Sequence, residues 1–403
     1  MSGSETESMP ENTGANEQAA VVQGRIVALD RARTFGTLLV VIYHSVIDYT
    51  VFGNGDRQRW LGFDLTVLFN DSFFMACMFL ISGLFVHDSL TRRGAAQYLR
   101  QRAWRLGVPL LISIFFLIPI AYYASFLRYH PAGTTDFNFF HFWWRMLTIG
   151  PWPSGQSWFL WVLLVFNLAA AAVWSTAPQI LNSLGQWIAA LRARPIAAFV
   201  AFSILSVVTY LPMQLAFGGG AWFEPGHYPF PIQTSRILLY PAFFFTGVGI
   251  GAVSLRTGLL AENGPIAKRW ALWLAFAVLL YGAILLLVYA HHNWLADFNS
   301  PALWWKAAYG IAFALFSAAM PFTILATSLR LARSSLSLLD AMRPQAYGIY
   351  LLHYIFIIWL QYAVYGAALP AGVKAAIVFG GTLSGSWALT VLLRRIPLVA
   401  RMI

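Results

Sequence analysis

The chain has 403 residues, of which 59% are apolar, 16% aromatic and only 10% charged, and its mean hydropathy is +0.65. Soluble chains are about 45–50% apolar and about 25% charged, so this composition excludes a soluble enzyme, a secreted disulfide scaffold and a disordered regulator. The single cysteine, Cys77, can make neither an internal disulfide nor, by itself, a zinc site.

Residues 1–24 differ in composition from the rest of the chain. They contain four glutamates and no lysine or arginine. Such a segment is too polar to pack a core, and it lacks the basic and apolar regions of a secretory signal. We therefore expect a short, disordered, acidic cytoplasmic tail, followed by one transmembrane domain over residues 25–403.

The remainder of the chain predicts an all-α polytopic membrane protein with about ten transmembrane helices. Ten apolar stretches are each long enough, at about 1.5 Å per residue, to cross a hydrocarbon layer of about 30 Å. Their expected spans are 34–53, 66–88, 107–127, 157–176, 196–216, 236–254, 271–290, 303–326, 347–366 and 374–393.

The basic residues predict the orientation of these helices. Lysine and arginine accumulate in cytoplasmic connections, and nineteen of the 26 basic residues fall in the inner segments if the amino terminus is cytoplasmic. Both termini are therefore expected on the cytoplasmic side. The net charge of +11 then reflects membrane topology, and we do not expect nucleic-acid binding. The other seven basic residues, near the outer side, are Arg57, Arg59, Arg128, Arg145, Arg236, Lys306 and Lys374.

The first helix carries an arginine and a histidine that share one face. Eleven residues separate Arg33 from His44, which is a rise of about 16 Å and almost three turns. Arg33 is therefore expected at the cytoplasmic mouth and His44 near the middle of the bilayer. Ionisable side chains inside a membrane are costly and indicate function. The pair predicts a path that leads from a cationic entrance to an imidazole.

Two carboxylates are candidates to orient that imidazole. Asp48 lies one turn beyond His44 on the same face, and Asp71, near the outer end of the second helix, should reach a similar depth. Either could hold the ring in one tautomer, which is the role of the third group beside a catalytic base. Each could equally be a polar contact between helices, and Asp48 is the weaker candidate.

Five arginines precede the third helix. Arg102 and Arg105 are three residues apart and should project to the same side of a helix. Arginine suits bidentate capture of phosphate, so a phosphorylated donor on the cytoplasmic side is the expected ligand. Anchoring to lipid headgroups remains an alternative, most of all for Arg92 and Arg93. The fifth of these arginines is Arg100.

Other motifs carry less chemistry. The segment 247–251, Gly-Val-Gly-Ile-Gly, lies inside an apolar stretch with no preceding strand, so it indicates close helix packing and not a dinucleotide site. The histidines near the outer side, His227, His291 and His292, have no metal-ligand spacing, and no metal site is expected.

Several segments together resemble the acyltransferase-3 family of integral membrane acyltransferases, and most of all its branch of periplasmic glucan succinyltransferases. They occur in family order across nearly all of the chain after residue 25. The matching segments are Ala28–Arg33 leading to His44, Leu68–Asp71 with Phe79–Gly83, Arg102–Pro109, Ser157–Leu160, Tyr240–Gly247, Tyr347–His353 and Arg395–Leu398.

The resemblance implies a ten-helix enzyme in a bacterial inner membrane. Such an enzyme takes an acyl group from cytoplasmic acyl-CoA and delivers it to a hydroxyl of a periplasmic glucan or other carbohydrate. It binds no permanent cofactor, and succinyl-CoA is the favoured co-substrate, with acetyl-CoA next. The resemblance assigns His44 the catalytic role and Arg33, Arg102 and Arg105 the donor side. The oligomeric state is left open.

The remaining candidates and the competing function stay open at this point. Trp158 and His353 lie in matched segments and join Asp48 as orienting or acceptor-side candidates, although His353 could also be a structural residue in its helix. A proton-coupled secondary transporter or exporter is the alternative, because buried aspartate and histidine can relay protons. Such a carrier does not need an arginine cluster, and we find no inverted repeat.

Overall fold

The computed structural model describes residues 13–53, 55–130, 138–253, 258–261, 264–294, 301–331 and 334–403, with side chains from Val27 onward. The first half of the chain is almost entirely helical. Its elements are α1 (Thr13–Val46), η1 (Ile47–Tyr49), α2 (Leu61–Asp71), α3 (Phe74–Gly83), α4 (Val86–Arg102), η2 (Ala103–Gly107), α5 (Val108–Ile112), η3 (Ser113–Leu117), α6 (Ile118–Tyr129), α7 (Phe139–Thr148), η4 (Gly155–Ser157), α8 (Trp158–Thr176) and α9 (Pro178–Ala190).

The second half adds one short hairpin to further helices. Strands β1 (Trp222–Phe223) and β2 (Ile232–Gln233) pair antiparallel, with Trp222 opposite Gln233. The helices are α10 (Pro195–Phe217), η5 (Thr234–Arg236), α11 (Leu239–Ala252), α12 (Pro265–Lys268), α13 (Trp270–Trp294), α14 (Leu303–Arg330), α15 (Ser337–Met342), η6 (Arg343–Gln345), α16 (Ala346–Tyr365), α17 (Ala371–Leu393) and α18 (Pro397–Ala400).

The chain is an all-α polytopic membrane protein. Nine helical stretches among the described residues are long and apolar enough to cross a bilayer, and they coincide with nine of the ten expected spans. The tenth expected span, 34–53, falls on α1 and η1. Helix α1, which also contains Asp30, Arg31 and Arg33, is not among the nine.

The start of α1 differs from the expected tail. We expected residues 1–24 to be a disordered tail, yet α1 begins at Thr13 and so includes the second half of that stretch. Residues 13–24 contain Ala19 and Ala20 and no proline, and this composition is compatible with a helix. Residues 1–12 lie outside the described part of the chain.

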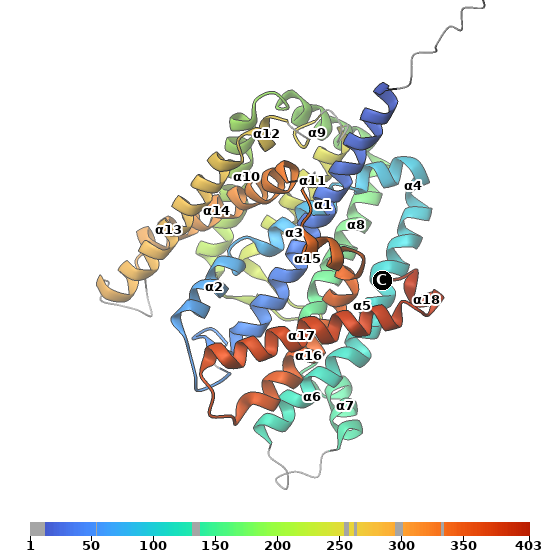
Figure 1. The fold of residues 1–403 in the computed structure, drawn as a ribbon. Helices are drawn as coiled ribbons and strands as arrows, with labels where there is room; N and C mark the ends of the chain where they lie inside the picture. Colours follow the sequence, from blue (N-terminus) through green and yellow to red (C-terminus); the bar gives the residue numbers. More distant parts are fainter. Residues whose placement is uncertain are drawn as a thin grey trace, which may run out of the picture.

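Helix α1 lies in the middle of the bundle. It contacts α16, α14, α17 and α3, and Figure 1 shows it passing between the α13–α14 pair and the α16–α17 pair. Val27 of α1 and the last residue, Ile403, line the same cavity. Helix α1 therefore presents one face to several neighbours along the path from Arg33 to His44.

The glycines of segment 247–251 pack α11 tightly against α3. A Cβ atom on Gly247 would lie 2.1 Å from the carbonyl oxygen of Leu80, and one on Gly251 would lie 2.2 Å from that of Leu84. Only glycine permits this backbone approach. The prediction that this segment serves close helix packing is confirmed.

Two prolines each remove one main-chain hydrogen bond from the helical segment between α4 and α6. Pro109 has no N–H for the carbonyl of Arg105, and Pro119 has none for the carbonyl of Phe115. The segments before them, η2 and η3, are π-helical. Side chains satisfy both carbonyls: Tyr347 donates its hydroxyl to Arg105 O (2.6 Å), and Trp143 donates its indole N–H to Phe115 O (2.7 Å).

Candidate functional site

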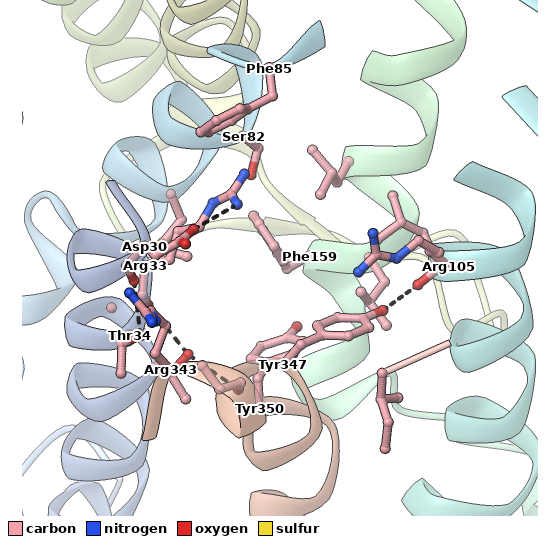
Figure 2. Close-up of a pocket in the computed structure, with 18 of the residues that line it drawn as sticks. Asp30, Arg33, Thr34, Ser82, Phe85, Arg105, Phe159, Arg343, Tyr347 and Tyr350 are labelled. Carbon is pink, nitrogen blue, oxygen red and sulfur yellow. Dashed lines mark hydrogen bonds and ion pairs between the residues drawn. The ribbon is translucent and has the colours of Figure 1, made fainter. Parts of the chain in front are cut away.

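A cavity of about 1300 Å³ opens where the middle of α1, the end of α4 and the carboxyl terminus meet. Helices α1 and α3 form one wall, α4, η2 and α8 form the opposite wall, and η6 with α16 forms the base. Figure 2 shows Arg33 and Arg343 on one side and Arg105 on the other, with Phe159, Tyr347 and Tyr350 between them.

The cavity is strongly cationic. Six arginines line it, and Asp30 is the one aspartate or glutamate among its lining residues. Cations that converge on one space repel each other, so packing alone does not favour this arrangement, whereas an anion within the cavity would stabilise it. The six are Arg33, Arg93, Arg102, Arg105, Arg343 and Arg394.

On the α1 side, Arg33 is held in place but only partly satisfied. Its guanidinium lies 4.2 Å from the centre of the Phe85 ring and 3.7 Å from a carboxylate oxygen of Asp30. Its side chain is 41% exposed. Stacking on an aromatic ring fixes the plane of the guanidinium and leaves N–H groups free to donate.

On the opposite wall, the backbone is shaped by a glycine and a proline. Gly94 has a φ of +73° and bends α4, and Arg102, past this bend, lies 5.0 Å from the centre of the Tyr98 ring. Arg105 follows in the π-helical turn before Pro109, where its carbonyl accepts from Tyr347 of α16. The two arginines expected on one side of a helix do line the same cavity.

The inner end of the cavity lies one helical turn from His44. Val40 is the last residue of α1 in the lining. His44 is not a lining residue, so the expected path ends one turn earlier than predicted. The separation is short, because Nδ1 of His44 lies 3.0 Å from the carbonyl oxygen of Val40, and the His44 side chain is partly exposed.

His44 lies against α16. Its Nδ1 is 3.4 Å from Nε2 of His353, and the ring makes edge contacts with Tyr43 and Tyr354 at centroid distances of 5.2 and 5.4 Å. The side chain of Gln361 donates to the main-chain carbonyl of His44 (2.9 Å). The structure thus brings His353, which was a candidate for an orienting or acceptor-side role, into contact with His44.

The carboxylates expected to orient His44 have other partners. Asp71 forms an ion pair with Arg236, with one N–O distance of 3.1 Å, and Asp48 forms one with Arg128 at 2.7 Å. No hydrogen bond joins either carboxylate to His44 within the described residues. The orienting role predicted for Asp71 and Asp48 is therefore corrected. In a low-dielectric bundle a carboxylate gains more from a guanidinium than from a neutral imidazole.

The comparison with known families decides which class of protein this is. A family model described as an acyltransferase domain, of the acyltransferase-3 type, matches residues 26–391. The chain belongs to the acyltransferase-3 family. It is a membrane acyltransferase, and the resemblance seen in the sequence motifs is confirmed at the level of the family. No curated protein and no solved structure shows a significant match to the chain.

In this acyltransferase, Trp158 lies away from the arginines. Its ring packs against Tyr240 at 5.7 Å and against Trp222 of strand β1 at 5.9 Å. It thereby links α8 to the β1–β2 hairpin, whose Trp222 is 44% exposed. Trp158 remains an acceptor-side candidate by position.

Four further residues line the cavity but were not among the site residues predicted from the sequence: Arg343, Arg394, Tyr347 and Tyr350. The signal for Arg343 and Arg394 was present, because each lies beside an apolar span in a connection expected to be cytoplasmic. Tyr347 and Tyr350 carried a weaker signal. They are spaced by three residues on the α16 face that continues to His353, and the predictions noted only the histidine.

Proposed function

We propose that this acyltransferase moves a short acyl group from acyl-CoA on the cytoplasmic side to a carbohydrate hydroxyl on the opposite side of the membrane. The observation that carries the proposal is the cationic cavity whose inner end lies one turn from His44. Arginines recognise the phosphates of the donor, and the thioester end extends toward the imidazole. The accumulation of basic residues on that side supports its assignment as cytoplasmic.

The reaction needs one proton acceptor. The imidazole of His44 removes the proton from the acceptor hydroxyl as the hydroxyl oxygen attacks the thioester carbon. The carbon–sulfur bond then breaks, and the thiolate of CoA takes the proton back from the imidazolium. The products are an ester and free CoA. Transfer through an acyl-histidine intermediate follows the same path in two steps.

The side chains in contact with His44 favour an uncharged acyl group. The resemblance to the glucan branch favoured succinyl, whose free carboxylate would need a basic partner near the thioester. The side-chain contacts of His44 are with His353 and two tyrosines, none of which would pair with a carboxylate as an arginine or lysine does. We therefore favour acetyl over succinyl, with a periplasmic glucan or another glycan of a bacterial cell envelope as acceptor.

A transfer assay with purified protein tests the proposal. The protein in detergent is incubated with acetyl-CoA or succinyl-CoA and a soluble glucan, free CoA is measured with a thiol reagent, and the ester is measured by mass spectrometry. Thiol release that depends on the acceptor is expected, with loss of at least about 10²-fold in His44→Ala. His292→Ala, at the far end of α13, is the matched control. A His44→Ala variant as active as the control would refute the assignment, and no ester from any acyl-CoA would favour the transporter alternative.

A further inference from the structure

The hydrogen-bond geometry around His44 fixes which of its nitrogens carries the proton. A main-chain carbonyl oxygen can only accept a hydrogen bond. Nδ1 of His44 lies 3.0 Å from the carbonyl oxygen of Val40, so Nδ1 carries the hydrogen. In the neutral ring, Nε2 of His44 is then the unprotonated nitrogen.

The same reasoning applies to His353. Its Nδ1 lies 2.6 Å from the carbonyl oxygen of Tyr350, so this nitrogen also carries the hydrogen, and Nε2 of neutral His353 is an acceptor. That acceptor is 3.4 Å from Nδ1 of His44. The two assignments, made from separate carbonyl groups, agree with each other. The Nδ1–H of His44 is shared between Val40 O and His353 Nε2.

The remaining nitrogen of His44 is free to react. Within the described residues, Nε2 of His44 makes no hydrogen bond, and it is absent from the buried polar atoms that lack a partner. Neither histidine lines the cavity, but His353 is fully buried whereas His44 is partly exposed. One ring is therefore accessible at its unprotonated nitrogen, and the other contacts only protein.

We propose that His353 is a positioning residue that, together with the carbonyl of Val40, holds His44 in the Nδ1–H tautomer and directs its unprotonated Nε2 toward the substrates. When His44 accepts the hydroxyl proton at Nε2, the new positive charge is shared through Nδ1–H with the neutral acceptor of His353. A neutral imidazole thus takes the place that a carboxylate occupies in a serine–histidine–aspartate triad. Asp71 and Asp48 are not needed for this role, because each is neutralised by an arginine.

Two substitutions separate this role from simple packing. His353→Gln can place an amide oxygen where the acceptor nitrogen stands, whereas His353→Leu fills the site without an acceptor. The kinetic arm rests on the proposed acyl transfer. We expect His353→Leu to lower kcat by a factor on the order of 10²–10³ with the KM for acyl-CoA unchanged, and His353→Gln to recover kcat to within about tenfold of the wild type. Equal kcat losses in two variants with wild-type melting temperatures would overturn the proposal.

A spectroscopic arm does not depend on activity. The full chain labelled with ¹⁵N-histidine in lipid nanodiscs gives separate ring-nitrogen shifts for protonated and unprotonated positions, and the His44 signals are assigned by their loss in His44→Ala. We expect neutral His44 to be protonated at Nδ1 in the wild type and in His353→Gln. A ring protonated at Nε2 in the wild type would overturn the inference even if acyl transfer is observed. If wild-type protein transfers no acyl group, the proposed function fails, while the tautomer result still stands or falls by itself.

Discussion

The arginines that line the cavity differ from the paired cations at the other end of the helix bundle. At the end away from the arginine cavity, three buried cations are each paired with one carboxylate: Arg128 with Asp48, Arg236 with Asp71 and Lys374 with Asp56. In the cavity, six arginines are lining residues but Asp30 is the one carboxylate among them, and it pairs with Arg33. Paired charges hold helices and loops together, whereas converging cations without enough carboxylates favour an anionic ligand. The comparison separates structural charges from functional charges.

The largest effect is expected at the most buried pair. The side chains of Lys374 and Asp56 are only 2% and 4% exposed, and Nζ of Lys374 lies 2.8 Å from the carboxylate. Removal of one partner leaves an uncompensated buried charge, which costs about 3–5 kcal/mol. We expect Lys374→Met to lower the melting temperature in detergent markedly without changing the KM for acyl-CoA.

The double variant Lys374→Met/Asp56→Asn is the control for this prediction. It removes both charges, so it should recover much of the lost stability. A Lys374→Met protein as stable as the wild type would contradict the assignment of this pair as structural.

The second-largest effect is expected at Arg105 in the cavity, where a substitution should weaken the binding of acyl-CoA. Arg105 belongs to no ion pair among the described residues, so Arg105→Ala should leave the melting temperature unchanged. A hydrogen bond to a charged group contributes about 1.5–3 kcal/mol, so the KM for acyl-CoA should rise by roughly 10–150-fold. An acyl-pantetheine donor, which lacks phosphates, is the control. An equal loss with both donors would show that Arg105 does not act on a phosphate.

The membrane spans and the arginines of the cavity were predictable from local sequence patterns. Apolar length predicted ten spans, nine of which the structure confirms. The eleven-residue interval from Arg33 to His44 predicted an arginine at the entrance and an imidazole deeper along the same helix, and His44 lies one turn beyond the last α1 residue of the lining. Both features depend on a single helix, whose rise and period are known. The arginines of the cavity were likewise visible as inner-side charges, because all six lie beside or between predicted apolar spans.

The pairings between distant helices were not predictable. Asp71 and its partner Arg236 are 165 residues apart, and Asp48 and Arg128 are 80 apart. A single sequence does not show which helix faces which, so the carboxylates were assigned to the nearest titratable group, His44. The same limit applies to His353, which is 309 residues from His44. Its helix was expected, and its neighbour was not.

A smaller effect is expected where the two walls of the cavity are joined. Tyr347 donates to Arg105 O, the carbonyl left free by Pro109. Tyr347→Phe leaves this carbonyl without a partner, which should cost about 1 kcal/mol and raise the KM for acyl-CoA slightly. Pro109→Ala restores a backbone N–H, so the double variant should regain stability in the same thermal assay. A double variant less stable than Tyr347→Phe alone would show that the proline has another role.

The smallest effect compares two adjacent arginines. Arg92 forms an exposed ion pair with Asp88, and its side chain is 67% exposed, whereas Arg93 lines the cavity. Exposed helical pairs contribute about 0.3–0.5 kcal/mol, so Arg92→Ala should change stability by no more than this and leave the KM for acyl-CoA within about twofold. Arg93→Ala should raise that KM more, and more steeply at low ionic strength. Identical KM values for both variants would mean that position in the cavity does not distinguish a donor-binding arginine from one that only marks the cytoplasmic side.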